Sequence, residues 1–253
     1  MLEIDIQRKS YIQHKPEREL LVLDNIKIRL EEGEFLALVG PSGCGKSTLL
    51  QIVSGLDKSF EGNITWIDKS STSSANLGYV FQNPRLLPWL NLRDNITLVL
   101  DNPADKKQQV DELLEATGLS AFSDYHPGQL SIGMQRRAAL ARAFVVEPSL
   151  LIMDEPFVSL DGPTAFQLRQ LLLDILEVRC TTVVFVTHDL HEATMLADRI
   201  LFLSSSPAKV IGESQVDLAR DIRTNEDEVG KRYFEIKTLF ESYYQSDTIS
   251  PDS

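Results

Sequence analysis

The chain has 253 residues, of which 43% are hydrophobic and 25% charged, and its formal net charge is −12. This composition is typical of a folded globular protein with a sizeable core. The acidic balance argues against nucleic acid as a partner, because binding to the phosphate backbone calls for a basic stripe. No apolar run approaches the roughly 18 residues of a membrane-spanning helix. The first residues do not resemble a secretion signal, and two cysteines without a metal or disulfide pattern suit a reducing cytoplasm.

The spacing of apolar residues predicts strands and helices in alternation along most of the chain. Strands are expected at 2–6, 20–30, 35–39, 61–67 and 77–81, with a helix at 47–54 and Tyr11 in a polar connection. Helical periodicity follows at 91–119 and 131–146. Strands at 150–153, 181–187 and 199–203 then alternate with helices at 162–178 and 190–197, before an amphipathic helix at 226–244. This order predicts a mostly parallel sheet covered by helices.

The segment around which the chain is organised lies between the predicted strand at 35–39 and the helix at 47–54. It fits G-x-x-x-x-G-K-[ST], the phosphate-binding loop of P-loop NTPases, with residues Gly40, Pro41, Ser42, Gly43, Cys44, Gly45, Lys46, Ser47 and Thr48. Its glycines allow backbone N–H groups to converge on an anion, and the helix start adds further donors. We expect Lys46 to reach the β- and γ-phosphates and the Ser47 hydroxyl to bind Mg²⁺.

Three further polar residues follow predicted strands. Asp154 and Glu155 end the strand at 150–153, and His188 follows the strand at 181–187. Ligands of parallel α/β sheets bind at the carboxyl ends of strands. Asp154 fits the acid that holds Mg²⁺ in P-loop NTPases, and Glu155 could polarise the attacking water. Alone, either acid could simply cap a strand, and His188 could be an ordinary polar residue.

From residue 2 to about 212 the chain resembles the nucleotide-binding subunit of an ATP-binding cassette transporter. The motifs that carry the resemblance occur in the family's order: the phosphate loop, Gln82, the signature LSIGM at 130–134, the strand ending in Asp154 and Glu155, the turn SLD at 159–161, and His188. Within the superfamily, the segments GEFLALVGPSGCGKSTLL and VTHDLHEATMLADRI are similar to the ATPases of nitrate, sulfonate and taurine importers.

The resemblance implies roles for single residues. Tyr11 matches the aromatic residue that stacks on adenine, and His188 the one that contacts the γ-phosphate. Gln82 matches the residue that senses Mg²⁺ and the attacking water, so that Ser47, Gln82 and Asp154 are the expected metal residues. Glu155, His188 and Gln82 form the expected catalytic set.

A second group is implied to act on the nucleotide of the opposite subunit in a head-to-tail dimer. Its members are Ser131, Gly133, Met134 and Asp161. Ser131 is also a good N-cap residue, which is its ordinary structural reading. The signature departs from the family at Ile132, where a glycine is usual. A β-branched side chain restricts the backbone there. The sequence therefore leaves open whether this protein hydrolyses ATP at the full rate of the family.

The resemblance also implies the architecture. We expect an α/β protein with a P-loop NTPase core, a mostly parallel sheet, an antiparallel β subdomain and an inserted α-helical subdomain. Residues 1–82 and 148–213 form the ATP-binding core with the β subdomain. Residues 83–147 form the helical subdomain with the signature, and residues 214–253 form a helical extension and tail.

The sequence therefore predicts an ATPase that binds ATP and Mg²⁺ at the cytoplasmic face of a membrane. Its expected partners are a second copy, a permease whose coupling helix docks near residues 84–90, and indirectly a solute-binding protein. A small anionic solute is expected. Alternatives are a catalytically weak cassette, which Ile132 keeps open, and a DNA-repair or ribosome-associated ATPase. The last two would need a long coiled coil or a second cassette.

Overall fold

The computed structural model describes residues 1–14, 17–66 and 76–249. The chain divides into two compact units, which are described separately. The first unit joins Met1–Thr72 to Thr182–Ser253, and the second is Ser73–Thr181. The predicted division at residues 82, 147 and 213 follows the motifs rather than packing, and it stays a prediction.

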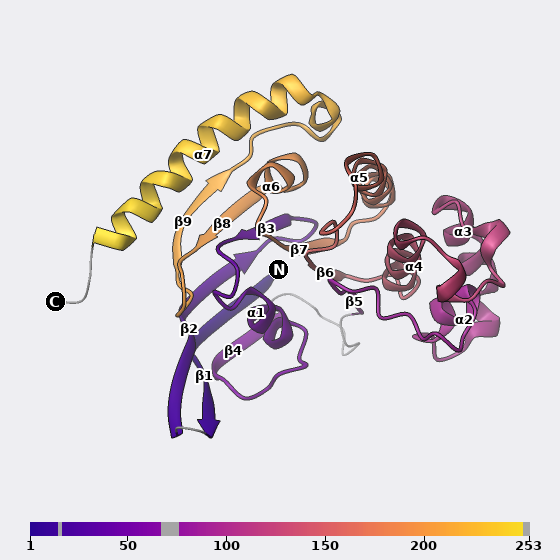
Figure 1. Ribbon diagram of the computed structural model, residues 1–253, viewed down its shortest axis with the longest axis horizontal. Coiled ribbons are helices and arrows are strands. Elements are labelled where there is room, and N and C mark those ends of the chain that lie inside the picture. Colours follow the sequence, from indigo (N-terminus) through magenta and orange to yellow (C-terminus); the bar gives the residue numbers. More distant parts are fainter. Residues whose placement is uncertain (15–16, 67–75, 250–253) are drawn as a thin grey trace. The chain divides into compact units, whose positions relative to one another are not determined.

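The first unit contains a three-stranded antiparallel sheet in the order β2-β1-β4 (Figure 1). Its strands are β1 (Leu2–His14), β2 (Glu17–Leu30) and β4 (Glu61–Trp66). Leu2, Ile4 and Ile6 are buried and alternate with more exposed residues, as expected of a strand with one face covered. The placement of Tyr11 in a connection was wrong, because β1 continues to His14 and Tyr11 pairs with Leu20.

A second sheet of the first unit is mostly parallel. Its strands lie in the order β7 (Thr182–Thr187), β3 (Phe35–Val39), β8 (Arg199–Leu203) and β9 (Val210–Gln215). β3 is parallel to both its neighbours, whereas β9 is antiparallel to β8. Every residue of β3 and β7 is buried, which matches their continuous apolar sequences. Two helices of this unit, α1 (Lys46–Val53) and α6 (Leu190–Leu196), follow β3 and β7 in the chain.

The C-terminal helix α7 (Glu226–Ile249) runs along β9, as Figure 1 shows. A short 3₁₀ helix, Arg220–Thr224, precedes it. Val229 and Ile236 of α7 are fully buried, and the Phe240 ring lies 5.1 Å from that of Phe202. The Tyr244 hydroxyl donates to the carbonyl oxygen of Leu203 at 2.6 Å, and burial raises the pKa of Tyr244 to about 12. The predicted amphipathic helix is therefore present and packs on the sheet.

The second unit pairs β5 (Leu77–Val80) in parallel with β6 (Leu150–Asp154). Its helices are α2 (Leu92–Thr97), α3 (Lys107–Ala116), α4 (Ile132–Phe144) and α5 (Gly162–Glu177). The helical stretch expected at 91–119 is interrupted, because Pro103 starts a 3₁₀ helix, Pro103–Lys106, between α2 and α3. Val110, Leu113 and Leu114 of α3 form its buried face. Helices α2 and α3 contact α4.

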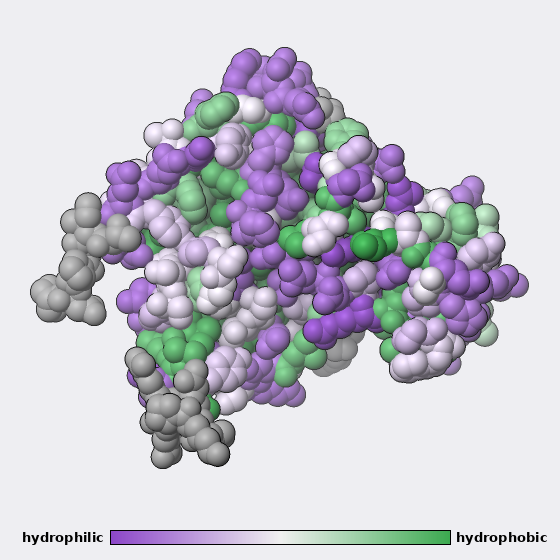
Figure 2. All heavy atoms as spheres, in the orientation of Figure 1, coloured by the Kyte–Doolittle hydropathy of each residue, from purple (hydrophilic) through white to green (hydrophobic). Residues whose placement is uncertain are grey.

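The surface carries both hydrophilic and hydrophobic residues. On the face shown in Figure 2, hydrophilic residues are spread widely, and hydrophobic residues lie between them in small groups. Among residues 1–14, 17–66 and 76–249, no helix combines the length and the apolar character needed to cross a membrane.

The packing of α7 on β9 can be tested at Gly212. A Cβ atom added there would lie 2.4 Å from the Tyr243 ring, so we expect Gly212→Ala to lower the free energy of unfolding by about 1–3 kcal/mol. At Gly230 of α7 a Cβ atom meets nothing within 4 Å, so Gly230→Ala should raise stability by about 0.5–1 kcal/mol. Urea denaturation of both variants measures this. Equal stability of Gly212→Ala and the wild type would show that Tyr243 does not cover β9.

Candidate functional site

The phosphate loop lies between β3 and α1 and is packed tightly against its own unit. Cβ atoms added at Gly40 and Gly45 would lie 3.0 Å from Leu203 and 2.9 Å from Val22 and Leu23. Gly45 also has a φ of +123°, a conformation that residues with side chains rarely adopt. The two glycines therefore let the loop approach β8 and β2, which leaves its backbone as the surface that a ligand meets.

Lys46, the first residue of α1, is buried with 5% of its surface exposed. Its ammonium group donates to the carbonyl oxygens of Gly40 at 2.8 Å and Pro41 at 2.9 Å, so it is held over the loop. Gly45, the N-cap of α1, has no side chain to accept from the first amides of the helix. Such a helix start is a site for anions, because its N–H groups and the helix dipole point outward.

The other side chains of the loop are either exposed to solvent or buried behind it. Ser42 and Ser47 are exposed. Cys44 is 2% exposed, and burial raises the pKa of its thiol. The Cys44 side chain thus packs behind the loop as a neutral group, and only its backbone can contribute to ligand binding.

His188 follows β7 and leaves the sheet beside the phosphate loop. Val39 at the end of β3 pairs with Thr187 at the end of β7, so Gly40 and His188 follow neighbouring strands at the same edge. The turn is fixed by hydrogen bonds of Thr187, whose hydroxyl oxygen accepts from the Asp189 amide at 3.0 Å. His188 is exposed there. The structure thus brings this predicted residue to the loop within one unit.

Tyr11 lies on the part of β1 that runs beside β2 toward the loop. It pairs with Leu20, two residues from Val22, which contacts the Gly45 position. The Lys9 ammonium group lies 4.4 Å from the centroid of the Tyr11 ring, and the Tyr11 hydroxyl donates to Asp57 at 3.3 Å. Lys9 is itself paired with Asp57 at 2.7 Å. The ring is 39% exposed, which leaves part of it available for stacking.

In the second unit, Gln82, Asp154 and Glu155 follow the paired ends of β5 and β6. Val80 pairs with Met153, so Asp154, the last residue of β6, and Gln82, two residues beyond β5, lie at the same edge. Glu155 has a φ of +43° and Ser159 one of +66°. A left-handed conformation at a residue other than glycine costs on the order of 1–3 kcal/mol and clusters at functional sites. The backbone is therefore constrained at the predicted catalytic glutamate.

The signature residues and Asp161 lie together in the same unit. Ser131 caps α4 by accepting from the Met134 amide at 3.2 Å, and Asp161 caps α5 by accepting from the Thr164 amide at 3.0 Å. The Thr164 amide and hydroxyl hold the pKa of Asp161 below its usual range. A Cβ atom added at Gly133 would lie 2.7 Å from the Thr164 methyl group, so the starts of α4 and α5 are in close contact.

Ile132 occupies the first position of α4 and is 59% exposed. It has ordinary helical backbone, so its side chain causes no left-handed strain in the subunit. Its large exposed side chain instead adds an apolar group to the surface of the signature itself.

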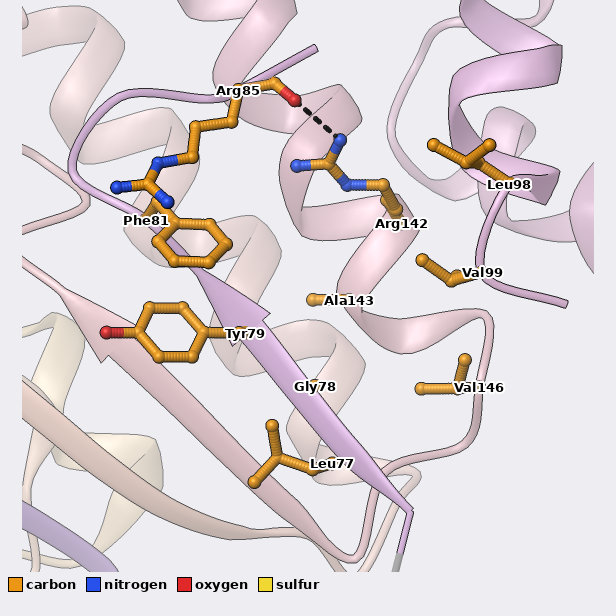
Figure 3. A pocket seen from close by; sticks show the side chains of 10 residues that line it. All are labelled: Leu77, Gly78, Tyr79, Phe81, Arg85, Leu98, Val99, Arg142, Ala143 and Val146. Carbon is orange, nitrogen blue, oxygen red and sulfur yellow. Dashed lines mark hydrogen bonds between the residues drawn. The ribbon is translucent and has the colours of Figure 1, made fainter. Parts of the chain in front are cut away.

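A pocket of about 260 Å³ opens in the second unit (Figure 3). The Tyr79 and Phe81 rings stack at 4.0 Å along one side, and Arg85 lies 4.0 Å above Phe81. Leu98 and Val99 line the opposite side, where they are 52% and 46% exposed. The pocket is thus apolar, with guanidinium groups at its edge.

The loop beside this pocket, at residues 84–91, is held by two buried polar side chains. Asn95 accepts from the Leu87 amide at 2.7 Å and donates to the carbonyls of Leu87, Leu90 and Asn91. Arg142 donates to the carbonyls of Pro84 at 2.7 Å and Arg85 at 2.9 Å, the latter drawn in Figure 3. Neither residue was predicted to have this role, because a polar residue in a helical sequence gives no sign that it is buried.

A Mg²⁺ site can be built from few protein ligands. In the part of the chain that the structure describes, no three His, Cys, Asp or Glu side chains gather closely enough to hold a metal ion. Mg²⁺ commonly binds through one or two protein oxygens together with water and substrate phosphates. The hydroxyl of Ser47, the amide of Gln82 and the carboxylate of Asp154 are oxygen ligands of the type that Mg²⁺ prefers.

Comparison with known proteins agrees with this geometry. The model of the ABC transporter family matches residues 23–158. The aliphatic sulfonates import ATP-binding protein SsuB 2 of Burkholderia cenocepacia (strain HI2424) is 43% identical over 222 residues, which cover 87% of this chain and 80% of that protein. The corresponding SsuB of Bacillus subtilis (strain 168) is 42% identical over 209 residues, 82% of this chain and 81% of its own.

Two solved structures of a dimeric ATP-binding cassette are also similar, each 31% identical and covering 87% of this chain and 100% of the solved chain. One, described as a bacterial ABC transporter cassette, matches with a TM-score of 0.74. The other, in a post-hydrolysis state with ADP and phosphate, matches with a TM-score of 0.73. The predicted α/β class with a P-loop NTPase core is confirmed, and the chain belongs to the ABC transporter family as an ATP-binding ATPase subunit.

Proposed function

We propose that this ATPase energises the import of a small anionic solute of the sulfonate type through a separate permease. The observation that carries the proposal is the phosphate loop, whose glycines and buried Lys46 form an anion-binding surface at a helix start. Support for the solute class comes from the relatives at 42–43% identity that are named for the import of aliphatic sulfonates.

The residues of the first unit bind the nucleotide. The backbone N–H groups of Gly40 and of Ser42 to Thr48 surround the phosphates, and Lys46 exchanges its loop carbonyls for the β- and γ-phosphate oxygens. Tyr11 stacks on the adenine through its exposed face. His188, which follows β7 beside the loop, contacts the γ-phosphate. Lys46 binds phosphate through its charge, and Tyr11 binds adenine through its aromatic ring.

Hydrolysis requires Mg²⁺ and a general base in addition to the bound nucleotide. Ser47, Gln82 and Asp154 are the residues that would hold the metal ion, and a bound Mg²⁺ would neutralise charge on the phosphate oxygens. Glu155 accepts a proton from the attacking water, and Gln82 orients that water. The left-handed backbone at Glu155 restricts the direction of its side chain, as a positioned base requires.

A second copy of the chain completes the site. Ser131, Gly133, Met134 and Asp161 act on the nucleotide of the partner subunit, so the active species is a head-to-tail dimer. The start of α4, where Ser131 accepts from the Met134 amide, carries the positive end of the helix dipole and can meet a γ-phosphate. The dimeric state of both similar cassette structures supports this assembly.

The permease docks on the second unit, and it holds the ATPase at the cytoplasmic face of the membrane. The apolar pocket beside the loop at 84–91 receives its coupling helix, with Leu98 and Val99 as contacts. A solute-binding protein delivers the solute to that permease. ATP binding shifts the dimer toward its closed form because ATP binds that form more tightly.

Replacement of the base tests the mechanism. We expect Glu155→Gln to bind ATP normally but to lower kcat by on the order of 100-fold or more, since the amide cannot accept the proton. The variant should accumulate as a nucleotide-bound dimer in size-exclusion chromatography with ATP. Glu177→Gln, which changes an exposed glutamate at the end of α5, is the control. Hydrolysis at the wild-type rate by Glu155→Gln would remove Glu155 from the mechanism.

A change in the pocket tests docking. The double variant Leu98→Ser and Val99→Ser should weaken recruitment to permease-containing membranes while ATP affinity stays the same, because both side chains are exposed and lie in the second unit. Val178→Ser, at an apolar residue that is 81% exposed outside the pocket, controls for lost surface hydrophobicity. Sedimentation with the membranes measures recruitment. If the double variant and the control bind equally well, the pocket is not the docking site.

A further inference from the structure

Arg136 is a buried cation of the second unit that none of the proposed roles involves. It lies one turn into α4, beyond the signature, and only 5% of its surface is exposed. Its guanidinium group donates to the carbonyl oxygen of Gln82 and, at 2.9 Å, to that of Val158. One side chain of the signature helix therefore holds the backbone of two other loops.

Both loops belong to the proposed catalytic machinery. Gln82 is the proposed metal and water residue. Val158 lies between Glu155 and Asp161, in a turn whose ends at Glu155 and Ser159 have φ values of +43° and +66°. Left-handed residues other than glycine persist only where their surroundings hold them. The hydrogen bond from Arg136 to the Val158 carbonyl is a contact that holds this turn from outside its own segment.

The cost of placing a guanidinium group here is considerable. Burial lowers the pKa of Arg136, and its Nε atom has no hydrogen-bond partner among the described residues. Val80, Met153 and Phe157 line the same small cavity as Arg136 with apolar groups. A buried charge is weak evidence for stability, because well-packed apolar residues often stabilise a fold as much. The hydrogen bonds to the carbonyls of Gln82 and Val158 instead indicate that Arg136 acts on these two loops.

We propose that Arg136 is a positioning residue, which couples the signature helix to the loops of Gln82 and Glu155. Arg136 fixes the positions of the Glu155 turn and the Gln82 backbone relative to α4. A shift of the signature helix would therefore move Glu155 and Gln82 and change the geometry of hydrolysis. It contacts no nucleotide and does not set the affinity for ATP. This inference rests on the proposed function of those loops.

The adjacent Arg137 provides a matched control. It carries the same charge on the same helix but is less buried, and it donates to the Gln167 side chain at 2.7 Å and the Thr117 carbonyl at 3.4 Å. Neither of these two partners belongs to the loops that Arg136 holds. Loss of charge or of helix stability should therefore affect Arg136→Gln and Arg137→Gln alike, whereas loss of positioning should affect only the former.

The test compares Arg136→Gln, Arg136→Lys and Arg137→Gln with the wild type in kcat, in ATP affinity by calorimetry, and in hydrogen exchange. We expect Arg136→Gln to lower kcat by on the order of 10- to 100-fold, as small misplacements of catalytic groups do, with ATP affinity within about twofold of the wild type. Arg136→Lys can reach one carbonyl and should fall between. The amides of Asn83, Arg85 and residues 157–161 should exchange faster in Arg136→Gln but not in Arg137→Gln.

The inference is overturned if kcat and loop exchange in Arg136→Gln match those of Arg137→Gln, or if ATP affinity falls in proportion to kcat. Thermal denaturation checks that each variant is folded. If Arg136→Gln does not fold, Arg136→Lys takes its place in the comparison. The hydrogen-exchange comparison does not depend on activity. If the wild type hydrolysed no ATP, the proposed function would fail, while faster exchange in both loops would still support the coupling and unchanged exchange would still overturn it.

Discussion

The close approach of the phosphate loop to its neighbouring strands is the constraint on which the nucleotide site depends. At Gly40 and Gly45 the nearest atoms of Leu203, Val22 and Leu23 leave no room for a side chain. The backbone must therefore face the ligand, and Lys46 must lie over the loop rather than beside it. The loop thus offers a phosphate its backbone together with the Lys46 ammonium group, although the whole chain carries a net charge of −12.

The support of that loop extends far along the chain. Leu203, which lies against Gly40, accepts a hydrogen bond from Tyr244 near the end of α7. The C-terminal helix thus contributes to the wall behind the nucleotide site. In the second unit the corresponding constraint is the turn after β6, where Glu155 and Ser159 are left-handed and Arg136 holds the carbonyl between them. Each unit thus fixes the backbone of its proposed site residues by contacts with other parts of the same unit.

Much of this arrangement could be predicted from the residues. Continuous apolar runs identified β3, β6 and β7, and the spacing of the glycines and Lys46 identified the phosphate loop. Strands with mixed or polar sequence were harder. β9 was missed because its Gly-Glu-Ser-Gln end has no apolar pattern, and the outer half of β1 was missed because the polar run at residues 7–10 interrupts the alternation of apolar residues. Burial of Arg136, Arg142 and Asn95 was not predictable, since it arises from partners distant in the sequence.

The central claim is that Gly40 to Thr48 forms a working ATP site through Lys46, and calorimetric titration with Mg²⁺-ATP tests it most directly. Wild-type protein should bind, and Lys46→Ala should lose on the order of 10- to 100-fold in affinity with the loss of a charged hydrogen bond to phosphate. Lys58→Ala, which changes an exposed lysine in the connection between α1 and β4, is the control. Equal affinity of Lys46→Ala and the wild type would contradict this claim.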